Sequence, residues 1–335
     1  MALAVAAPAQ SASPAILSLD RATSSRASHV SHISQVATAR AFPRDARLAA
    51  HLDAFALASA ARPSARQDSH KHRAWRLRTR GRTGDDATLS SSSDDVPKEA
   101  KERAAAQEKA RSLVGDLKGT SIFLVGMMGS GKTTVGTLLA DLLGYCFFDS
   151  DRVVEAAAGG ASVAQIFAEN GEEEFREIET RVLAELSSMG RLVVATGGGA
   201  VTRPVNWSYL SHGVTVHLDV PVEHLAERVV AVGTAVRPLL SQPTQGEGEG
   251  GKQQAADESD EYGKTLTRLA GLLGERKSLY SNADTTISLQ EVAMRSASQV
   301  HEVTPTRIAL EILERLEQMV AERQARDAAL RAKAA

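Results

Sequence analysis

A run of eight residues near the middle of the chain has the residue types and spacing of a phosphate-binding loop. Residues 126–133 read Gly-Met-Met-Gly-Ser-Gly-Lys-Thr, which fits the pattern G-x-x-x-x-G-K-[ST]. Glycines let the backbone N–H groups turn toward phosphate oxygens, the Lys132 ammonium can reach the terminal phosphates, and the Thr133 hydroxyl can bind Mg²⁺. The residues expected to contact a nucleotide are Gly126, Gly129, Ser130, Gly131, Lys132, Thr133 and Thr134. An accidental glycine turn is the alternative.

Two carboxylates follow the next apolar run. Asp149 and Asp151 come after Tyr145–Phe148 and are two residues apart, so in extended backbone they share a face. Ligands of open α/β sheets bind outside the carboxyl ends of the strands, where this pair is expected. One carboxylate would suit Mg²⁺ and the other a base. The alternative is a polar strand end with helix-capping aspartates.

Further polar positions are weaker signals when each is taken alone. Arg176 precedes Glu179 by three residues on an expected helix, where a surface ion pair is the usual meaning. Gly197, Gly198 and Gly199 follow a strand and would allow a ligand close to the backbone, or form a flexible turn. Arg237 stands beside a polar segment that suits a lid, and Arg276 lies on one helix face with Tyr280.

Strands alternate with helices, as these residues require. Strands are expected at 121–125, 145–148, 191–195, 214–220 and, more weakly, 285–289. Helices are expected at 98–117, 134–143, 153–158, 163–170, 173–189 and 222–232, with a last one from Pro305 to about Arg323. This alternation predicts an α/β fold with a parallel sheet covered by helices on both faces. The polar stretch 241–261 reads as a mobile insertion.

Charge divides the chain of 335 residues unevenly. Residues 1–84 hold thirteen Lys or Arg against four Asp, a net charge of +9, so the remainder carries −11 of the total of −2. The first segment is rich in Ala, Ser and Arg and poor in acid, which favours an organelle transit peptide over a secretory signal. The alternative, a nucleic-acid-binding arm at 71–82, is disfavoured, and the few aromatic residues argue against a nucleic-acid platform.

Two classes of protein are excluded by simple counts. Cys146 is the only cysteine, so no disulfide can form within the chain, and its apolar surroundings favour a core role. No run approaches eighteen consecutive apolar residues, so no transmembrane helix and no membrane partner is expected. His212, His217 and His224 have no metal-ligand spacing with cysteine.

Taken in order, the motifs resemble those of the shikimate kinase family. The motifs are Gly-Met-Met-Gly-Ser-Gly-Lys-Thr, Phe-Asp-Ser-Asp, Glu-Phe-Arg-Glu-Ile-Glu, Thr-Gly-Gly-Gly-Ala, Arg-Pro-Leu-Leu and Arg-x-x-x-Tyr. Residues 193–209 are similar to the plant plastid form in particular, and the resemblance covers roughly 119–300. It implies a three-layer P-loop fold of the nucleoside-monophosphate-kinase type with a five-stranded parallel sheet, residues 152–180 as a helical substrate-binding region, and a lid near 234–262.

The resemblance also implies a role for each residue. Lys132, Asp151 and Arg237 would be catalytic, and Thr133 and Asp149 would hold Mg²⁺. Asp151 would contact the acceptor hydroxyl of shikimate, Arg176 and Arg276 its carboxylate, and Gly197, Gly198 and Gly199 its ring, while Glu179 would orient Arg176. Two features depart from the family pattern: the insertion is long, and Arg228 is only the nearest candidate for an adenine-side arginine.

The expected activity is ATP-dependent phosphorylation of the 3-hydroxyl of shikimate in the plastid stroma, by a monomer or weak homodimer. A non-catalytic paralogue and a kinase of another small substrate such as gluconate are the alternatives. The expected organisation is a transit peptide at 1–84, a polar linker and charged helix at 85–118, the kinase domain at 119–300, and a C-terminal helix and tail at 301–335.

Overall fold

The structure is a computed structural model, and it describes residues 97–233 and 258–334. Five strands form one parallel sheet: β1 (Ile122–Val125), β2 (Cys146–Asp149), β3 (Leu192–Ala195), β4 (Val214–Asp219) and β5 (Thr285–Ser288). Their order is β2-β3-β1-β4-β5. Every residue of β1 and β3 is buried, as the unbroken apolar runs of a parallel sheet require. The α/β fold with a five-stranded parallel sheet is therefore confirmed.

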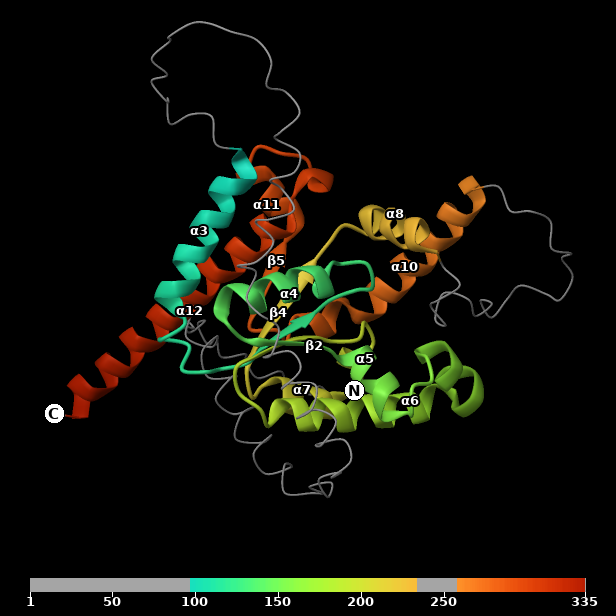
Figure 1. The fold of residues 1–335 in the computed structure, drawn as a ribbon, viewed down its shortest axis with the longest axis horizontal. Helices are drawn as coiled ribbons and strands as arrows, with labels where there is room; N and C mark the ends of the chain where they lie inside the picture. The colour runs from blue at the N-terminus through green and yellow to red at the C-terminus, as the bar shows by residue number, and fades with distance from the viewer. Residues whose placement is uncertain (1–96, 234–257, 335) are drawn as a thin grey trace, which may run out of the picture. The chain divides into compact units, whose positions relative to one another are not determined.

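Helices cover both faces of this sheet. The first three helices after β1 are α4 (Lys132–Leu143), α5 (Ser150–Ala157) and α6 (Val163–Ser187). They are followed by α7 (Pro204–Leu210), α8 (Val222–Val232), α10 (Glu258–Tyr280), α11 (Leu289–Arg295) and α12 (Pro305–Ala334). Figure 1 shows α4 and α12 on one side of the sheet, with α6 and α7 on the other. Short 3₁₀ turns lie at Ala200–Thr202 (η2) and Val300–Glu302 (η3).

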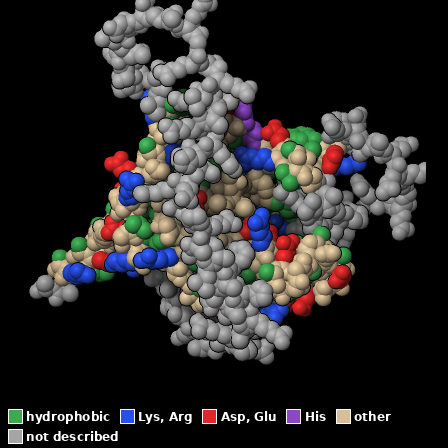
Figure 2. Space-filling view, in the orientation of Figure 1, with side chains coloured by type: hydrophobic (Ala, Val, Ile, Leu, Met, Phe, Trp, Pro, Cys, Tyr) green, Lys and Arg blue, Asp and Glu red, His purple; other side chains and the backbone are tan. Residues whose placement is uncertain are grey.

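The helix α3 (Lys98–Leu113), which precedes β1, packs on the core. Its Ala106, Ala110 and Leu113 are buried, and its main partner is α12. Figure 1 shows the two helices side by side. Lys109 pairs with Glu317 across them at 2.7 Å. The C-terminal part of α12 extends past this contact, and Figure 2 shows Lys and Arg side chains along it.

Several predicted boundaries were wrong by a few residues. The helix expected at 134–143 begins at Lys132, because Gly131 is the left-handed residue that precedes its first turn. The helix expected at 153–158 begins at Ser150, since the Asp149 side chain caps it. The helix expected at 98–117 ends at Leu113. The two helices expected at 163–170 and 173–189 form one element broken at Gly171 (φ 84°, ψ 173°) and ending at Ser187.

Other corrections concern missing or shortened elements. The helices α7 and α11 were not predicted; each has only seven residues, too few to show a clear helical period. The strands β1, β3, β4 and β5 are one residue shorter than expected, and Leu289 begins α11 instead. The strand β2 begins and ends one residue later than expected. Residues 258–261, assigned to the insertion, form the first turn of α10. The rest of the insertion, and with it most of the expected lid at 234–262, lies outside the described residues.

None of the helices in the described ranges is long and apolar enough to cross a membrane. The strand order changes direction at β1, which lies between β3 and β4. In open α/β sheets, the ends of the strands at such a point form the ligand crevice. The segments that follow β1, β2 and β3 are therefore the place where a functional site is expected.

Candidate active site

The loop that follows β1 curls around the side chain of its own lysine, Lys132. Gly131 has φ 89° and leads into α4, so Lys132 lies in the first helical turn. The Lys132 ammonium donates hydrogen bonds to the carbonyls of Gly126 and Met127, both at 2.8 Å, and to Ser130 Oγ at 3.3 Å. The lysine side chain therefore lies along the inner edge of the loop, where phosphate oxygens would meet it together with the helix N-terminus.

Close packing fixes the position of this loop. A Cβ atom on Gly126 would lie 2.7 Å from the Leu218 carbonyl oxygen, so the first glycine of the motif cannot carry a side chain. The Gly129 carbonyl accepts a hydrogen bond from Arg228 Nη1 at 3.2 Å. Arg228, the candidate for an adenine-side arginine, is therefore in contact with the phosphate loop. Thr134 is exposed in the first turn of α4.

The Asp149 carboxylate joins the end of β2 to the loop. Thr133 Oγ1 donates to Asp149 Oδ2 at 2.8 Å. The other oxygen, Oδ1, accepts from the backbone N–H of Asp151 at 3.2 Å and so caps α5. The helix-capping alternative and the pocket-facing interpretation are thus both satisfied, each by a different oxygen. No group of three His, Cys, Asp or Glu side chains that could hold a metal ion occurs among the described residues.

Asp151 is an acidic group whose surroundings oppose its charge. Burial raises its pKa to about 7, with the Asp149 and Glu179 carboxylates adding to the effect, while Lys132 and Arg176 act in the opposite direction. A carboxyl with a pKa near neutrality can accept and release a proton under ordinary conditions. The expected pair of aspartates therefore divides into a capping carboxylate that contacts Thr133 and a proton-binding carboxyl.

Arg176 and Glu179 form a buried ion pair, so the surface ion-pair alternative does not hold. Arg176 Nη1 donates to Glu179 Oε2 at 2.9 Å, and their side chains are 6% and 0% exposed. The second oxygen of Glu179, Oε1, is buried without a hydrogen-bond partner. Burial raises the pKa of Glu179 from its usual value, and the Arg176 charge opposes this.

The glycine turn after β3 lies against these charged groups. A Cβ atom on Gly197 would lie 2.6 Å from Asp151 Oδ1 and 2.7 Å from Glu179 Oε1. A Cβ atom on Gly199 would lie 2.5 Å from Arg176 Nη1 and 2.6 Å from its Cζ. The glycines therefore allow the charged side chains to approach the backbone, which is a stricter requirement than turn flexibility.

Arg276 reaches this turn from α10. Its Nη1 donates to the Gly198 carbonyl at 3.0 Å, and the residue is 5% exposed. A Cβ atom on Gly198 would lie 3.4 Å from the Met128 backbone nitrogen, so the turn also touches the phosphate loop. The predicted residues on β1, β2, α6, β3 and α10 are thus brought together. Arg237 lies outside the described residues.

Some contacts in the site were missed by the sequence reasoning. Arg203 forms ion pairs with Glu173 and Glu177 and so ties α6 to the segment after β3. Ser150 Oγ accepts the Gly197 N–H at 2.8 Å. No local sequence pattern points to either contact, because the partners are 26 to 47 residues apart. The contact of Glu172 with Arg176 was missed although its i, i+4 spacing was a usable signal.

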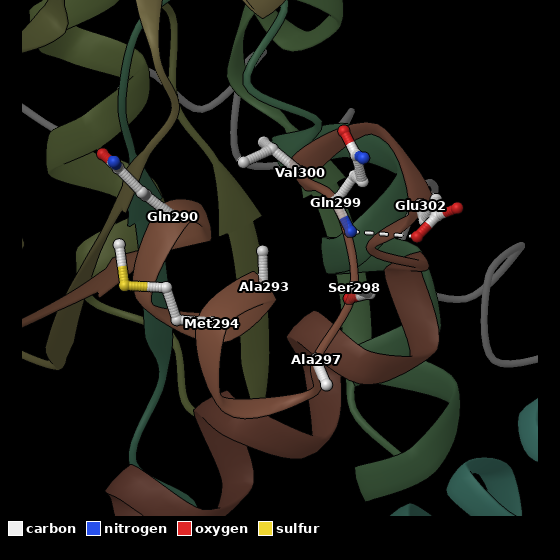
Figure 3. A pocket seen from close by; sticks show the side chains of 8 residues that line it. All are labelled: Gln290, Ala293, Met294, Ala297, Ser298, Gln299, Val300 and Glu302. Carbon is white, nitrogen blue, oxygen red and sulfur yellow. Dashed lines mark hydrogen bonds between the residues drawn. The ribbon is translucent and has the colours of Figure 1, made fainter.

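A large open hollow lies elsewhere on the surface, beside α11 and η3. Its volume is about 620 Å³, and Figure 3 shows its lining residues, with the Gln299 N–H bonded to Glu302. Its lining contains no Lys or Arg and shares no residue with the site above. It therefore lacks the positive charge that a polyphosphate requires.

Comparison with known proteins gives a consistent result. A family model described as shikimate kinase matches residues 128–317. The chain is 48% identical over 225 residues to a rice protein, Shikimate kinase 3, chloroplastic, covering 67% of this chain and 74% of the rice protein. It is 46% identical over 212 residues to Shikimate kinase 1, chloroplastic, of Arabidopsis thaliana, and the match covers 63% of this chain and 65% of the Arabidopsis protein. A shikimate kinase from Acinetobacter baumannii in complex with shikimate matches at 32% identity and TM-score 0.47, covering 64% of this chain and 98% of that one.

Proposed function

The chain belongs to the shikimate kinase family, and we propose from this membership how its residues divide the ATP-dependent phosphorylation of the 3-hydroxyl of shikimate. The observation that carries the proposal is the position of Asp151. The Asp151 and Glu179 carboxylates lie against the same face of Gly197, 2.6 Å and 2.7 Å from the place where its Cβ would be. Lys132 and Arg176 are near enough to influence the pKa of Asp151. Phosphoryl transfer to a hydroxy acid requires a proton acceptor near both the phosphate-binding lysine and a carboxylate-binding arginine.

The phosphate loop is the nucleotide side of the reaction. Its residues Gly126, Gly129, Ser130, Gly131, Lys132, Thr133 and Thr134 bind the ATP phosphates. Lys132 exchanges its hydrogen bonds with loop carbonyls for phosphate oxygens. Phosphoryl transfer needs positioning and positive charge more than covalent help, so this lysine stabilises the charge that develops on the moving group.

Thr133 and Asp149 suit Mg²⁺, because a hydroxyl and a carboxylate lie 2.8 Å apart at the foot of the loop. The site has few protein ligands, and Mg²⁺ is usually held by one or two such groups together with substrate phosphates and water. When bound, the ion neutralises phosphate charge. Asp149 also caps α5, and Thr133 also belongs to the phosphate loop.

The acceptor side binds shikimate. Asp151 accepts a hydrogen bond from the acceptor hydroxyl and takes its proton, consistent with a pKa of about 7. Arg176 and Arg276 bind the carboxylate, because a guanidinium fork matches two carboxylate oxygens. Gly197, Gly198 and Gly199 contact the ring, and Glu179 orients Arg176 through the 2.9 Å ion pair. Arg237 is proposed to reach the phosphates from a lid.

The chain is a chloroplast protein in this proposal, as its rice and Arabidopsis relatives are named. Residues 1–84 are proposed as the transit peptide, 85–118 as linker and helix, 119–300 as the kinase domain and 301–335 as the C-terminal helix and tail. The binding partners proposed are ATP, Mg²⁺ and shikimate, with neither nucleic acid nor membrane, and the enzyme is proposed to act as a monomer or weak homodimer.

The test is a coupled ADP-release assay on the full chain with ATP and Mg²⁺, with and without shikimate. We expect release that depends on shikimate and is absent with gluconate. Lys132→Ala serves as the inactive control. Binding of ATP without shikimate-dependent turnover would favour the non-catalytic paralogue, and turnover with gluconate would require another acceptor site.

A further inference from the structure

The second edge of the Arg176 guanidinium is occupied by a carboxylate that the reaction does not use. Glu172 Oε1 accepts from Arg176 Nη2 at 3.0 Å and from Nε at 3.3 Å. One oxygen thus bridges two donors of the fork. Nε and one terminal nitrogen form the edge at which arginine commonly binds a carboxylate with two parallel hydrogen bonds. Glu172 therefore fills a position that a substrate carboxylate would need.

The two glutamates on Arg176 differ in how firmly they are held. The Glu179 side chain is 0% exposed and lies inside the protein, whereas the Glu172 side chain is 49% exposed. Water can replace the protein contacts of Glu172 but not those of Glu179. The arginine thus keeps one permanent partner and has one that can leave.

The backbone beside Glu172 is also suited to movement. Gly171, immediately before it, has φ 84° and ψ 173°, a conformation that favours glycine and interrupts α6. No atom lies within 4 Å of the place where a Cβ of Gly171 would be. Glu172 is therefore the first residue of the second helical part of α6. Its carboxylate can swing away from Arg176 without unwinding a helix.

We propose that Glu172 is an internal placeholder for the substrate carboxylate. In the ligand-free enzyme it keeps the Arg176 fork paired and correctly oriented, and on binding the shikimate carboxylate displaces it into solvent. The inference rests on the proposed function, in that Arg176 must be a carboxylate-binding residue. It adds a residue that sets substrate affinity and does not itself contact the bound substrate.

The cost of this arrangement appears as weaker substrate binding. When only a fraction of the free enzyme has the fork available, the apparent dissociation constant rises by the inverse of that fraction. An ion pair with one half-exposed partner is worth little, so removing it is expected to tighten shikimate binding about threefold to tenfold. Loss of a structural contact would not improve affinity, which makes the sign of the change informative.

Isothermal titration of the full chain with shikimate tests the proposal. Glu172→Gln keeps the side-chain length and removes the charge, and its Kd is expected to fall about threefold to tenfold relative to wild type. Glu174→Gln is the matched control, because Glu174 lies on the same helix and its ion pair, with Arg181 at 3.9 Å, does not involve Arg176. Its Kd is expected to equal that of wild type.

A second titration separates the charge from other effects. Shikimate methyl ester lacks the carboxylate charge, so its affinity should not improve in Glu172→Gln. An unchanged or higher Kd for shikimate in Glu172→Gln would overturn the placeholder, as would an equal gain for the ester.

Failure of the proposed function would look different from these outcomes. If wild type did not bind shikimate, or if Arg176→Ala bound it as tightly as wild type, Arg176 would not be a carboxylate-binding residue. If both of those controls behave as expected and only the Glu172→Gln gain is missing, the proposed function stands and the placeholder alone is refuted.

Discussion

The phosphate loop and the acceptor pocket are built in opposite ways. The loop is one run of eight residues, and its lysine bonds to carbonyls five and six residues away in the chain. The acceptor pocket takes Asp151, Arg176, Gly198 and Arg276 from four different segments, and its contacts reach across as many as 78 residues. The loop is therefore a local structure that backbone conformation creates. The pocket is a tertiary structure that buried charge holds together.

The largest expected effect tests the local side of this comparison. Lys132→Ala should reduce kcat by more than about 10³-fold, because no other described residue holds an ammonium inside the loop. The coupled assay measures it, with circular dichroism as a check of folding. Near-normal turnover would mean that the loop does not carry the phosphate chemistry.

Asp151→Asn tests the charged pocket in two ways, and activity is the first. The loss of the proton acceptor should lower kcat by about 10²–10³-fold. For the wild type, kcat/KM should fall as pH drops below about 7, because the free enzyme then has a protonated Asp151. A flat profile between pH 6 and 8 would remove the base role from this residue.

The second effect of Asp151→Asn is on stability: the substitution that lowers activity should raise the free energy of unfolding. The pKa of Asp151 is about 7 in the folded protein and lies above its ordinary value of 3.8, so the unfolded chain loses this proton first as the pH rises. Wild-type stability is therefore lost between about pH 4 and 7. The variant should be more stable by up to about 4 kcal/mol at pH 8, with no gain below pH 4. Chemical denaturation at both pH values measures it.

Gly199→Ala tests whether close approach is what the pocket requires. The added methyl would collide with the Arg176 guanidinium, 2.5 Å from its Nη1, and displace it. The KM for shikimate should rise about tenfold or more, because positioning is lost. Gly263→Ala is the control, since nothing lies within 4 Å of its Cβ position. Equal KM values in both variants would mean that Arg176 is not held by this contact.

The smallest effect is expected far from both regions. Lys109→Met removes the ion pair with Glu317, whose side chains are 29% and 49% exposed. The free energy of unfolding should change by less than about 1 kcal/mol, as for other exposed pairs. Activity should stay at the wild-type value. A large loss of activity would show that the packing of α3 affects the site. The comparison of the phosphate loop with the acceptor pocket would then have to include α3.

The same contrast explains what the sequence could predict. The strand–loop–helix unit around the glycine-rich loop and the parallel sheet follow from patterns within a dozen residues, and these were correct. The aspartates were placed only in part: Asp149 ends β2 as expected, but Asp151 lies in the first turn of α5 and not in extended backbone. The nature of the Arg176–Glu179 pair was not decided, because spacing of three residues describes an exposed pair equally well. Only the fold shows that both side chains are buried beneath the turn after β3.

Other features had no local signal at all. Arg203 pairs with Glu173 and Glu177 because α6 packs beside the segment after β3. The Gly197 N–H donates to Ser150 Oγ because β2 and β3 are neighbours in the sheet. The capping of α5 by Asp149 was one of the two interpretations that the sequence allowed, but its simultaneous hydrogen bond with Thr133 depends on the fold. Contacts between residues that are distant in the chain cannot be predicted from local patterns until the order of the strands is known.

The pairing of α3 with α12 has a consequence for the way the chain acquires its structure. Lys109 and Glu317 are separated by 208 residues, and the buried face of α3 has α12 as its main partner. During synthesis α3 cannot pack against α12 until α12 has left the ribosome. Contacts of such long range slow folding and leave apolar surface exposed for longer. The helices α3 and α12 therefore pack together late, and the apolar face of α3 stays exposed until α12 has been synthesised.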